Sequence, residues 1–221
     1  SGDFPAESAE LIETLADFSI GVGELVTGGG GEAGQTQRLR RALAEKGWEK
    51  HNFLVETIVD GVRREAMSHE IDHVRRGPSG VLALEIEWNN KDPFFDRDLE
   101  NFQRLHGQSA ISLGIVVTRG RSLQDRMLDR IASWMSRQGL GSEADLERLG
   151  LKDRTERQRR AVQGRVDQGM FFAEAFARVF VADKFGPSTT HWAKLEDRVM
   201  RGVGNPCPLV LIGLPDGILV E

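Results

Sequence analysis

Two glutamates at the end of an apolar segment are the residues in this sequence best suited to chemistry. Residues 81–88 have the composition of a strand, along which side chains alternate between the two faces of a sheet. One face is then apolar throughout, while the other ends in Glu85 and Glu87. Two acids on the same face of an apolar strand indicate that something cationic binds beside them.

A third acid, Asp72, is predicted to face this pair across a hairpin. If the chain folds back in the middle of the Gly-Pro-Ser-Gly turn, Gly77 faces Gly80, and counting outward brings Asp72 opposite Glu85. Directly opposed residues have Cβ atoms about 4.5–5.5 Å apart, a separation at which like charges repel. Such a trio suits a hard divalent cation such as Mg²⁺, which prefers oxygen ligands. The alternative is a solvated sheet face with ordinary surface acids.

A competing metal motif overlaps this segment. His69, Glu70 and His73 have the H-E-x-x-H spacing of a zinc metalloprotease. That motif works on a helix, where the two histidines share one face and the glutamate serves as base. The surroundings here are extended, and histidines four residues apart on a strand are about 13 Å apart, too far to share a metal ion. Zinc protease chemistry therefore remains the weaker interpretation.

Composition excludes several classes of protein. The chain has 221 residues, 39% of them hydrophobic and 29% charged, which is typical of a globular protein. Its single cysteine, Cys207, excludes internal disulfides and favours a cytoplasmic location. No apolar run has the length of a membrane helix, so no membrane association is expected. The net charge of −5 argues against a general nucleic-acid coat, although only six of the 29 basic residues are lysine, and arginine suits phosphate and guanine recognition.

Hydrophobic periodicity predicts an α/β fold in which helices flank one mixed β-sheet. Asp60-Gly61 is a strong hairpin signal, and Asp92 is predicted to cap a helix with Pro93 at its first position. The helices are expected at 7–18, 36–47, 92–106, 122–138, 168–184 and 190–201, and the strands at 51–59, 68–76, 81–88, 109–118 and 209–214. The simplest organisation is one domain over 1–221, with an N-terminal helix and glycine-rich linker (1–31), a catalytic core (36–118), and a helical part with the last strand (119–221).

Residues 85–102, EIEWNNKDPFFDRDLENF, extend the motif into a recognisable pattern. Reached from an aspartate on the preceding strand, this segment resembles the BglII/BamHI-like type II restriction endonucleases, a branch of the PD-(D/E)xK nuclease superfamily. The resemblance runs from about residue 36 to residue 214 and includes the stretches 189–195 and 202–208. It implies a restriction-endonuclease-like core and Mg²⁺-dependent hydrolysis of double-stranded DNA, with 5′ phosphates on the products.

The resemblance also assigns roles to the three acids. Asp72 and Glu85 match the two metal-binding acids of the family, and the carbonyl of Ile86 would complete the Mg²⁺ site, with Mn²⁺ able to substitute. Glu87 stands where most of the superfamily has lysine, in an ExE variant of the motif. It could be a general base, a ligand of a second metal ion, or a group that orients water. Lys91 could supply the missing positive charge or contact a phosphate.

Candidate DNA contacts follow the motif. In the family an asparagine three positions after the last motif residue contacts bases, and Asn90 stands there; Asn89 and Asn90 could equally be turn residues. Arg119 and Arg121 follow the 109–118 strand and could contact bases or phosphates, or simply belong to a solvated loop. A basic stretch could follow the DNA backbone or form an exposed helix face; it comprises Lys152, Arg154, Arg157, Arg159, Arg160 and Arg165.

A palindromic DNA site favours a two-fold protein, so a homodimer is expected. Three alternatives to a restriction enzyme remain at this point. One is a nuclease of the same fold with low sequence specificity, acting in repair or defence. The others, of different classes, are a non-catalytic DNA-binding module and the zinc metalloprotease.

Overall fold

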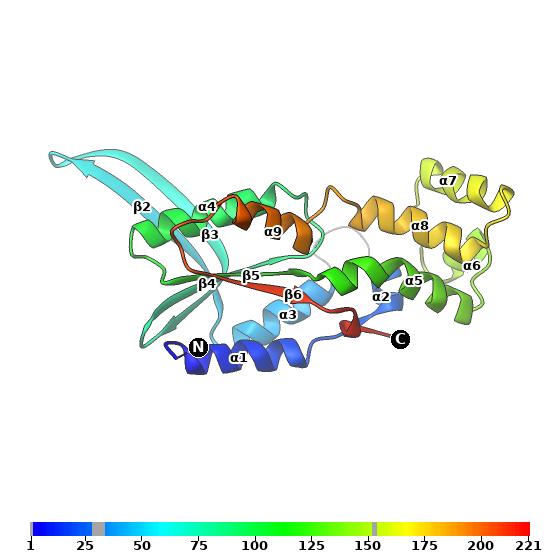
Figure 1. Cartoon of the computed structure of the whole chain (residues 1–221), viewed down its shortest axis with the longest axis horizontal. Coiled ribbons are helices and arrows are strands. Elements are labelled where there is room, and N and C mark those ends of the chain that lie inside the picture. The colour runs from blue at the N-terminus through cyan, green and yellow to red at the C-terminus, as the bar shows by residue number, and fades with distance from the viewer. Residues whose placement is uncertain (1, 28–33, 152–153) are drawn as a thin grey trace.

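A five-stranded mixed sheet forms the centre of the computed structural model, which describes residues 2–27, 34–151 and 154–221. In spatial order the strands are β2 (Glu49–Val59), β3 (Val62–Gly77), β4 (Gly80–Glu87), β5 (Leu113–Arg119) and β6 (Leu209–Leu214). The first three are antiparallel neighbours, and β4, β5 and β6 run parallel to one another (Figure 1). Two short strands, β1 (Ile20–Gly21) and β7 (Leu219–Val220), pair separately. The predicted mixed α/β architecture is confirmed.

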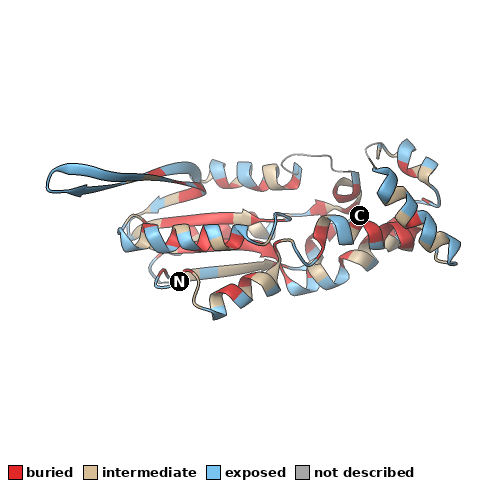
Figure 2. Cartoon of the chain, turned by 90° about the horizontal axis from the view of Figure 1, so that it is seen from above, coloured by how far each residue is buried: buried red, intermediate tan, exposed pale blue. Residues whose placement is uncertain are grey.

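Helices cover both faces of this sheet because alternate residues of β4 and β5 point to opposite sides. Leu84 and Val117 belong to a hydrophobic cluster shared with α1 (Pro5–Ala16), α2 (Val22–Thr27), α3 (Gly34–Glu45), α5 (Arg121–Arg137) and α8 (Phe172–Phe185). Ala83 and Val116 belong to a second cluster shared with α4 (Phe94–Gly107) and α9 (Trp192–Met200). In Figure 2 the central strands are coloured red, since they are buried between these layers.

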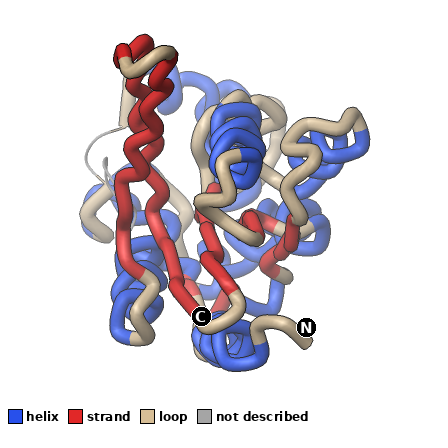
Figure 3. The backbone as a smooth tube through the Cα atoms, turned by 90° about the vertical axis from the view of Figure 1, so that its left-hand side faces the viewer, coloured by secondary structure: helices blue, strands red, loops and turns tan. Residues whose placement is uncertain are grey.

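The β2–β3 hairpin extends beyond the rest of the sheet (Figures 1 and 3). Its turn is the predicted Asp60-Gly61 pair, and both residues have positive φ, 52° and 75°, as a tight hairpin turn requires. The outer half of the hairpin is exposed, and Leu54 and Ile58 are each 62% accessible.

The other end of the molecule is a group of helices around α8 (Figure 1). Beside α5 and α8 it contains α6 (Glu143–Arg148) and α7 (Glu156–Asp167). The Thr155 hydroxyl accepts a hydrogen bond from the Gln158 N–H, and the Gln158 side chain accepts one from the Thr155 N–H, so α7 begins with a capping box. The sequence does not predict α2, α6 or α7, nor the 3₁₀ turn η1 (Asp216–Ile218).

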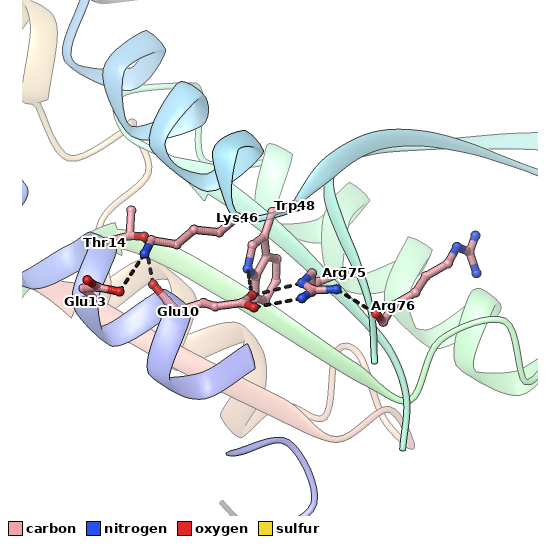
Figure 4. Close-up of polar contacts among 7 residues, drawn as sticks. All are labelled: Glu10, Glu13, Thr14, Lys46, Trp48, Arg75 and Arg76. Atoms are coloured by element: carbon pink, nitrogen blue, oxygen red, sulfur yellow. Dashed lines mark hydrogen bonds and ion pairs between the residues drawn. The ribbon is translucent and has the colours of Figure 1, made fainter. Parts of the chain in front are cut away.

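An ion-pair network joins α1 to the sheet (Figure 4). The Glu10 carboxylate accepts hydrogen bonds from Arg75 Nε at 3.0 Å and Nη2 at 2.8 Å, and from Trp48 Nε1 at 3.1 Å. Lys46 pairs with Glu13 one turn further along α1. Three donors to one carboxylate lower the pKa of Glu10, chiefly through the Arg75 hydrogen bonds.

Two predicted details of the helices are wrong. Asp92 does not cap α4, which begins at Phe94 with Pro93 in the capping position and no side-chain cap hydrogen bond. The Asp92 carboxylate instead lies 3.4 Å from Lys194 Nζ and near Arg198, linking the start of α4 to α9.

Likewise, α3 begins at Gly34, upstream of the predicted start at residue 36. Most of the predicted glycine linker lies outside the described residues, which resume at residue 34. None of the helices that the structure describes combines the length and apolar character needed to cross a membrane.

Candidate active site

Glu85 and Glu87 occupy the end of β4, and the hairpin register brings β3 alongside them. Gly77 pairs with Gly80, and the antiparallel pairing continues to His73 and Leu84. The next step of that register would set Asp72 against Glu85. Both carboxylates line a cleft of about 520 Å³ between β3, β4 and α4. The predicted turn register is therefore present, and it leads to a shared cleft.

A β-bulge in β3 determines how Asp72 is presented. His51 pairs with Ile71 and Glu49 with Val74, so Asp72 and His73 together oppose the single residue Lys50. Bulges are frequent beside active sites, where the extra residue redirects a side chain. His73 is 2% accessible, whereas the Asp72 side chain is 52% accessible at the cleft. The bulge thus buries the His73 side chain and leaves the Asp72 carboxylate open to solvent.

The two glutamates of β4 are buried, and a further acid is buried with them. Glu85 is 3% accessible, Glu87 is 2% accessible, and Asp98 on α4 is fully buried. Burial raises the pKa of Glu85 well above its usual range, and the charges of Asp98 and Asp72 raise it further. Burial, reinforced by Asp98, raises the pKa of Glu87 to about 8. Burial also raises the pKa of Asp98.

Few cations compensate these acids. Arg97 donates from Nε to Asp98 Oδ1 at 2.8 Å, and its Nη2 lies 3.7 Å from Glu87 Oε1. Lys50 pairs with Glu70 at 2.7 Å and lies 3.9 Å from Asp72. Neither residue forms an ion pair with Glu85 in the described part of the chain, and Asp98 Oδ2 has no hydrogen-bond partner. Buried carboxylates with so little compensation are costly unless a cation binds beside them.

This donor set fits a hard divalent ion. Mg²⁺ usually takes only one or two carboxylates from the protein and fills its remaining positions with water and substrate phosphate. Asp72 and Glu85 supply two carboxylates to one cleft. Within the described residues no group of three or more His, Cys, Asp and Glu side chains could hold a metal ion, so the predicted trio of Asp72, Glu85 and Glu87 does not form a three-ligand site. An open site of two carboxylates does not require a third.

The structure excludes the zinc metalloprotease interpretation. His69, Glu70 and His73 all lie on strand β3, where the helical geometry of the motif cannot form. His69 and His73 are buried while Glu70 is exposed. His69 Nδ1 lies 2.9 Å from Asn101 Oδ1, so its partner is an α4 amide.

The predicted DNA contacts divide into two groups. Asn89, Asn90, Lys91 and Arg121 are exposed. Asn90 donates from Nδ2 to Glu87 Oε2 at 2.8 Å, and Arg121 pairs with Glu196. These side chains remain accessible to DNA, although Asn90 and Arg121 also have partners within the chain.

The structure corrects the prediction made for Arg119. The sequence predicts a DNA contact, but Arg119 is fully buried and its guanidinium donates to the carbonyls of Trp88 and Thr190 at 2.7 and 2.6 Å. It also donates to Gln124, Phe185 and Thr189. Arg119 ends strand β5 inside the fold rather than in a surface loop, so it joins β4, α5 and the segment before α9.

The predicted basic stretch is mostly engaged with acids of the helical group. Lys152 lies outside the described residues. Arg154, Arg157, Arg159 and Arg160 pair with Glu143, Asp183, Glu147 and Glu156, respectively. Arg165 donates to the Ala161 carbonyl. These contacts favour the interpretation of an ordinary helix surface.

Sequence reasoning missed Arg97, which lines the cleft, and Asp98, which is buried beside Glu87. A signal for Asp98 was available, because it stands three residues after Phe95 and next to Leu99, on the buried stripe of the predicted helix. Aspartate is almost never fully buried without a partner, so an acid within an apolar stripe indicates a functional or paired carboxylate. Arg97 carries no such signal, since it lies on the helix face adjoining that stripe.

Fold and cleft together define the class of protein. A mixed sheet flanked by helices, with acids of neighbouring strands at one cleft, is consistent with the restriction endonuclease fold. The family model for restriction endonuclease BglII/BglIII matches residues 1–214. The chain therefore belongs to the BglII/BglIII restriction endonuclease family and is a site-specific deoxyribonuclease.

This family membership confirms the resemblance and extends it to the N-terminal helices. It also excludes the protease and the non-catalytic binding module. Restriction endonucleases of this type generally use a divalent metal ion. No curated protein matches the chain.

Proposed function

We propose that this enzyme is a Mg²⁺-dependent type II restriction endonuclease that cuts double-stranded DNA at a short palindromic site and leaves 5′ phosphates. The observation that carries this proposal is the meeting of Asp72 and Glu85 at one cleft, with Glu85 and Glu87 buried and poorly compensated by cations. A buried, under-compensated carboxylate pair beside an open cleft supports a metal site for a phosphodiester substrate.

Asp72, Glu85 and the Ile86 carbonyl would hold the metal ion, and Mn²⁺ would substitute for Mg²⁺. When bound, the ion would activate water and stabilise charge on the phosphate and the leaving oxygen. Glu87 Oε2 accepts a hydrogen bond from Asn90, and Arg97 Nη2 lies 3.7 Å from Oε1, so Glu87 would accept a proton from water or orient it from a position held by these two neighbours.

DNA contacts are proposed for residues between β4 and α4 and at the start of α5. Asn89, Asn90 and Lys91 follow the acidic motif directly, and all three are exposed. Arg121 is also exposed, with a side-chain accessibility of 61%. An asparagine reads adenine edges well, whereas lysine and arginine position the phosphate backbone. Substitution of Lys91 would therefore weaken binding to all DNA sequences alike, while substitution of Asn90 would relax specificity.

A homodimer is proposed because a two-fold DNA site calls for two symmetry-related active sites. The exposed Leu54 and Ile58 on the β2–β3 hairpin support a protein contact there. The hairpin turn region carries acids and arginines together, including Asp60, Arg63 and Glu65, which does not favour DNA phosphate as its partner. Sedimentation should give a dimer for the wild type and a monomer for a Leu54→Glu/Ile58→Glu variant. A monomeric wild type, free and on DNA, would contradict the dimer.

Plasmid cleavage tests the proposed function. Discrete fragments are expected with Mg²⁺, and none with EDTA or with the Asp72→Ala variant. Ligation of the products without kinase treatment would demonstrate their 5′ phosphates. A smear of fragments would favour a nuclease of low specificity, and cleavage that survives Asp72→Ala would remove the proposed active site.

A further inference from the structure

Arg97 is a cation that lines the cleft but has no role in the proposed metal site. It lies in the first turn of α4 and lines the cleft together with Asp72 and Glu85. Its side chain is 54% accessible, so the guanidinium is open to a ligand on one side. A cation exposed in this position can reach a substrate that enters the cleft.

Three contacts hold the Arg97 guanidinium in place. Nη2 lies 2.7 Å from Asp98 Oδ1, and Nε donates to the same oxygen. The guanidinium carbon stands 4.5 Å from the centre of the Phe94 ring, an arrangement that stabilises a cation. Nη2 also lies 3.7 Å from Glu87 Oε1. The side chain is therefore oriented before any substrate binds, which lowers the cost of using it.

Asp98 is placed to hold the Arg97 guanidinium in position. It is fully buried on α4, its Oδ1 accepts hydrogen bonds from Arg97, and its carboxyl also lies within hydrogen-bond distance of the Glu87 carboxyl. Because the Asp98 carboxylate is fully buried and does not line the cleft, it is poorly placed to bind the substrate directly. Its charge does, however, fix the position of the neighbouring guanidinium.

Other basic residues near the acids do not match this arrangement. Lys91 is exposed, does not line the cleft, and forms a backbone bridge with Thr189 instead. Lys50 is engaged by Glu70 and Asp72 on the outer side of β3. Arg104 lines the cleft two turns further along α4 but pairs with Glu100, and it forms no ion pair with Glu87.

We propose that Arg97 is a further catalytic residue, which contacts the scissile phosphate and stabilises the negative charge that develops on it, and that Asp98 is the residue that positions Arg97. This inference rests on the proposed active site. During hydrolysis a water oxygen bonds to phosphorus and gives up a proton to solvent, while the P–O3′ bond breaks and O3′ leaves with the bonding electron pair and takes a proton from solvent. Arg97 keeps its proton throughout and acts through charge and hydrogen bonds alone. The planar guanidinium, with several donors, suits a phosphate better than a single ammonium group would.

Single-turnover cleavage of a duplex containing the recognition site tests the proposal, with DNA affinity measured separately in Ca²⁺ by fluorescence anisotropy. The Arg97→Met variant should lose about 10²-fold in cleavage rate, comparable to removal of one group that stabilises a transition state, while its affinity for DNA changes little. Arg97→Lys should recover part of the rate. The matched control is Arg178→Met, because Arg178 also pairs with a carboxylate, has a similar accessibility of 47%, and lies on α8.

A double-mutant cycle separates positioning from simple support of the fold. Asp98→Asn alone should slow cleavage, and adding it to Arg97→Met should cause little further loss, because both act through one group. Additive losses from the two substitutions would show that Asp98 does not act through Arg97. Thermal unfolding of each variant identifies any that has failed to fold, in which case Arg97→Lys carries the test.

The outcomes distinguish this inference from the proposed function. If Arg97→Met cleaves as fast as the wild type while Asp72→Ala is inactive, the role of Arg97 is refuted and the active site stands. If Arg97→Met cleaves faster, Arg97 competes with the metal ion for Glu87, which also refutes the proposal. If Asp72→Ala retains activity, the active site itself is wrong.

Discussion

The ends of two neighbouring strands show opposite ways of burying charge. At the end of β5, Arg119 is fully buried and donates hydrogen bonds to five oxygen acceptors, all of them neutral. At the end of β4, which pairs with β5 in parallel, Glu85 and Glu87 are buried beside Asp98, and among the described residues Arg97 is the cation that forms ion pairs with Glu87 and Asp98. The fold supplies an acceptor for every N–H of the Arg119 guanidinium, whereas it leaves the carboxylates at the end of β4 with little compensating charge.

This difference separates a structural charge from a functional one. Burial lowers the pKa of Arg119 to about 9, yet its hydrogen bonds leave no donor direction for a ligand. Burial raises the pKa values of Glu85 and Glu87, and little in the described structure offsets this cost. A protein retains such a cost where a ligand compensates it, so incomplete pairing identifies the working site better than burial alone.

Removing the charge of Glu85 should produce the largest effect and should move activity and stability in opposite directions. We expect Glu85→Gln to lower the cleavage rate by about 10³-fold, equivalent to roughly 4 kcal/mol, through loss of a metal ligand. In EDTA the same variant should unfold at a higher temperature, by about 1 kcal/mol in stability, because an uncompensated buried charge is gone. Glu100→Gln, on the exposed face of α4, is the control and should change neither quantity. A destabilised Glu85→Gln protein would show that the fold already compensates this carboxylate.

Replacing Arg119 should produce the reverse pattern. The Arg119→Met variant leaves several buried acceptors without a donor, so the free energy of unfolding should fall by about 3–5 kcal/mol. Urea denaturation measures this loss. Arg121→Met, two residues further on and exposed, should cost at most about 1 kcal/mol. If both variants were equally stable, Arg119 would not be the structural charge described above.

The pH dependence of stability should distinguish the two strand ends as well. The pKa of Glu87 is raised to about 8 from an ordinary value of 4.5, so between these values the folded state binds more protons than the unfolded state. Stability contributed by the protonated carboxyl is complete below pH 4.5 and is lost as the pH rises through 8. In EDTA the stability of the wild type should fall relative to that of Glu87→Gln by about 1.4 kcal/mol for each pH unit across this range. Parallel pH profiles for the two proteins would contradict the raised pKa.

The smallest effect should come from the α1 network, whose charges are paired but partly exposed. The Glu10 and Arg75 side chains are 22% and 27% accessible. Glu10→Gln should therefore cost only about 1 kcal/mol, since the amide keeps some hydrogen bonds and solvent screens the rest. Because the hydrogen bonds from Arg75 lower the pKa of Glu10, the loss should be greatest at neutral pH and should shrink in acid. Cleavage activity should be unchanged.

Much of the sheet could be predicted from the sequence, because alternation and turn residues are local signals. The pairing of Gly77 with Gly80 follows from the turn chemistry of the segment between them, and the order of strands follows from periodicity. The bulge at Asp72 and His73 could not be predicted, since it depends on how Lys50 is accommodated by the neighbouring strand. Short helices such as α6 and α7 are held by packing against α5 and α8 rather than by a strong periodic pattern of their own.

The site was predictable in part for a related reason. Strand alternation alone places Glu85 and Glu87 on one face, but only tertiary packing brings Asp98 and Arg97 of α4 over that face. Arg119 illustrates the converse error: at the end of a strand it looks like a loop residue, while the segment before α9 folds over it. Local patterns identify which residues share a face, and contacts between distant segments decide which of them are open to a ligand.

The most direct test of the central claim is the response of thermal unfolding to Mg²⁺. We expect millimolar Mg²⁺ to raise the Tm of the wild type relative to EDTA and to leave the Tm of Glu85→Gln unchanged, because a bound ion compensates the buried carboxylates only when they are charged. An identical response of the two proteins to Mg²⁺, or no response in either, would contradict the assignment of the Asp72–Glu85 cleft as a metal site.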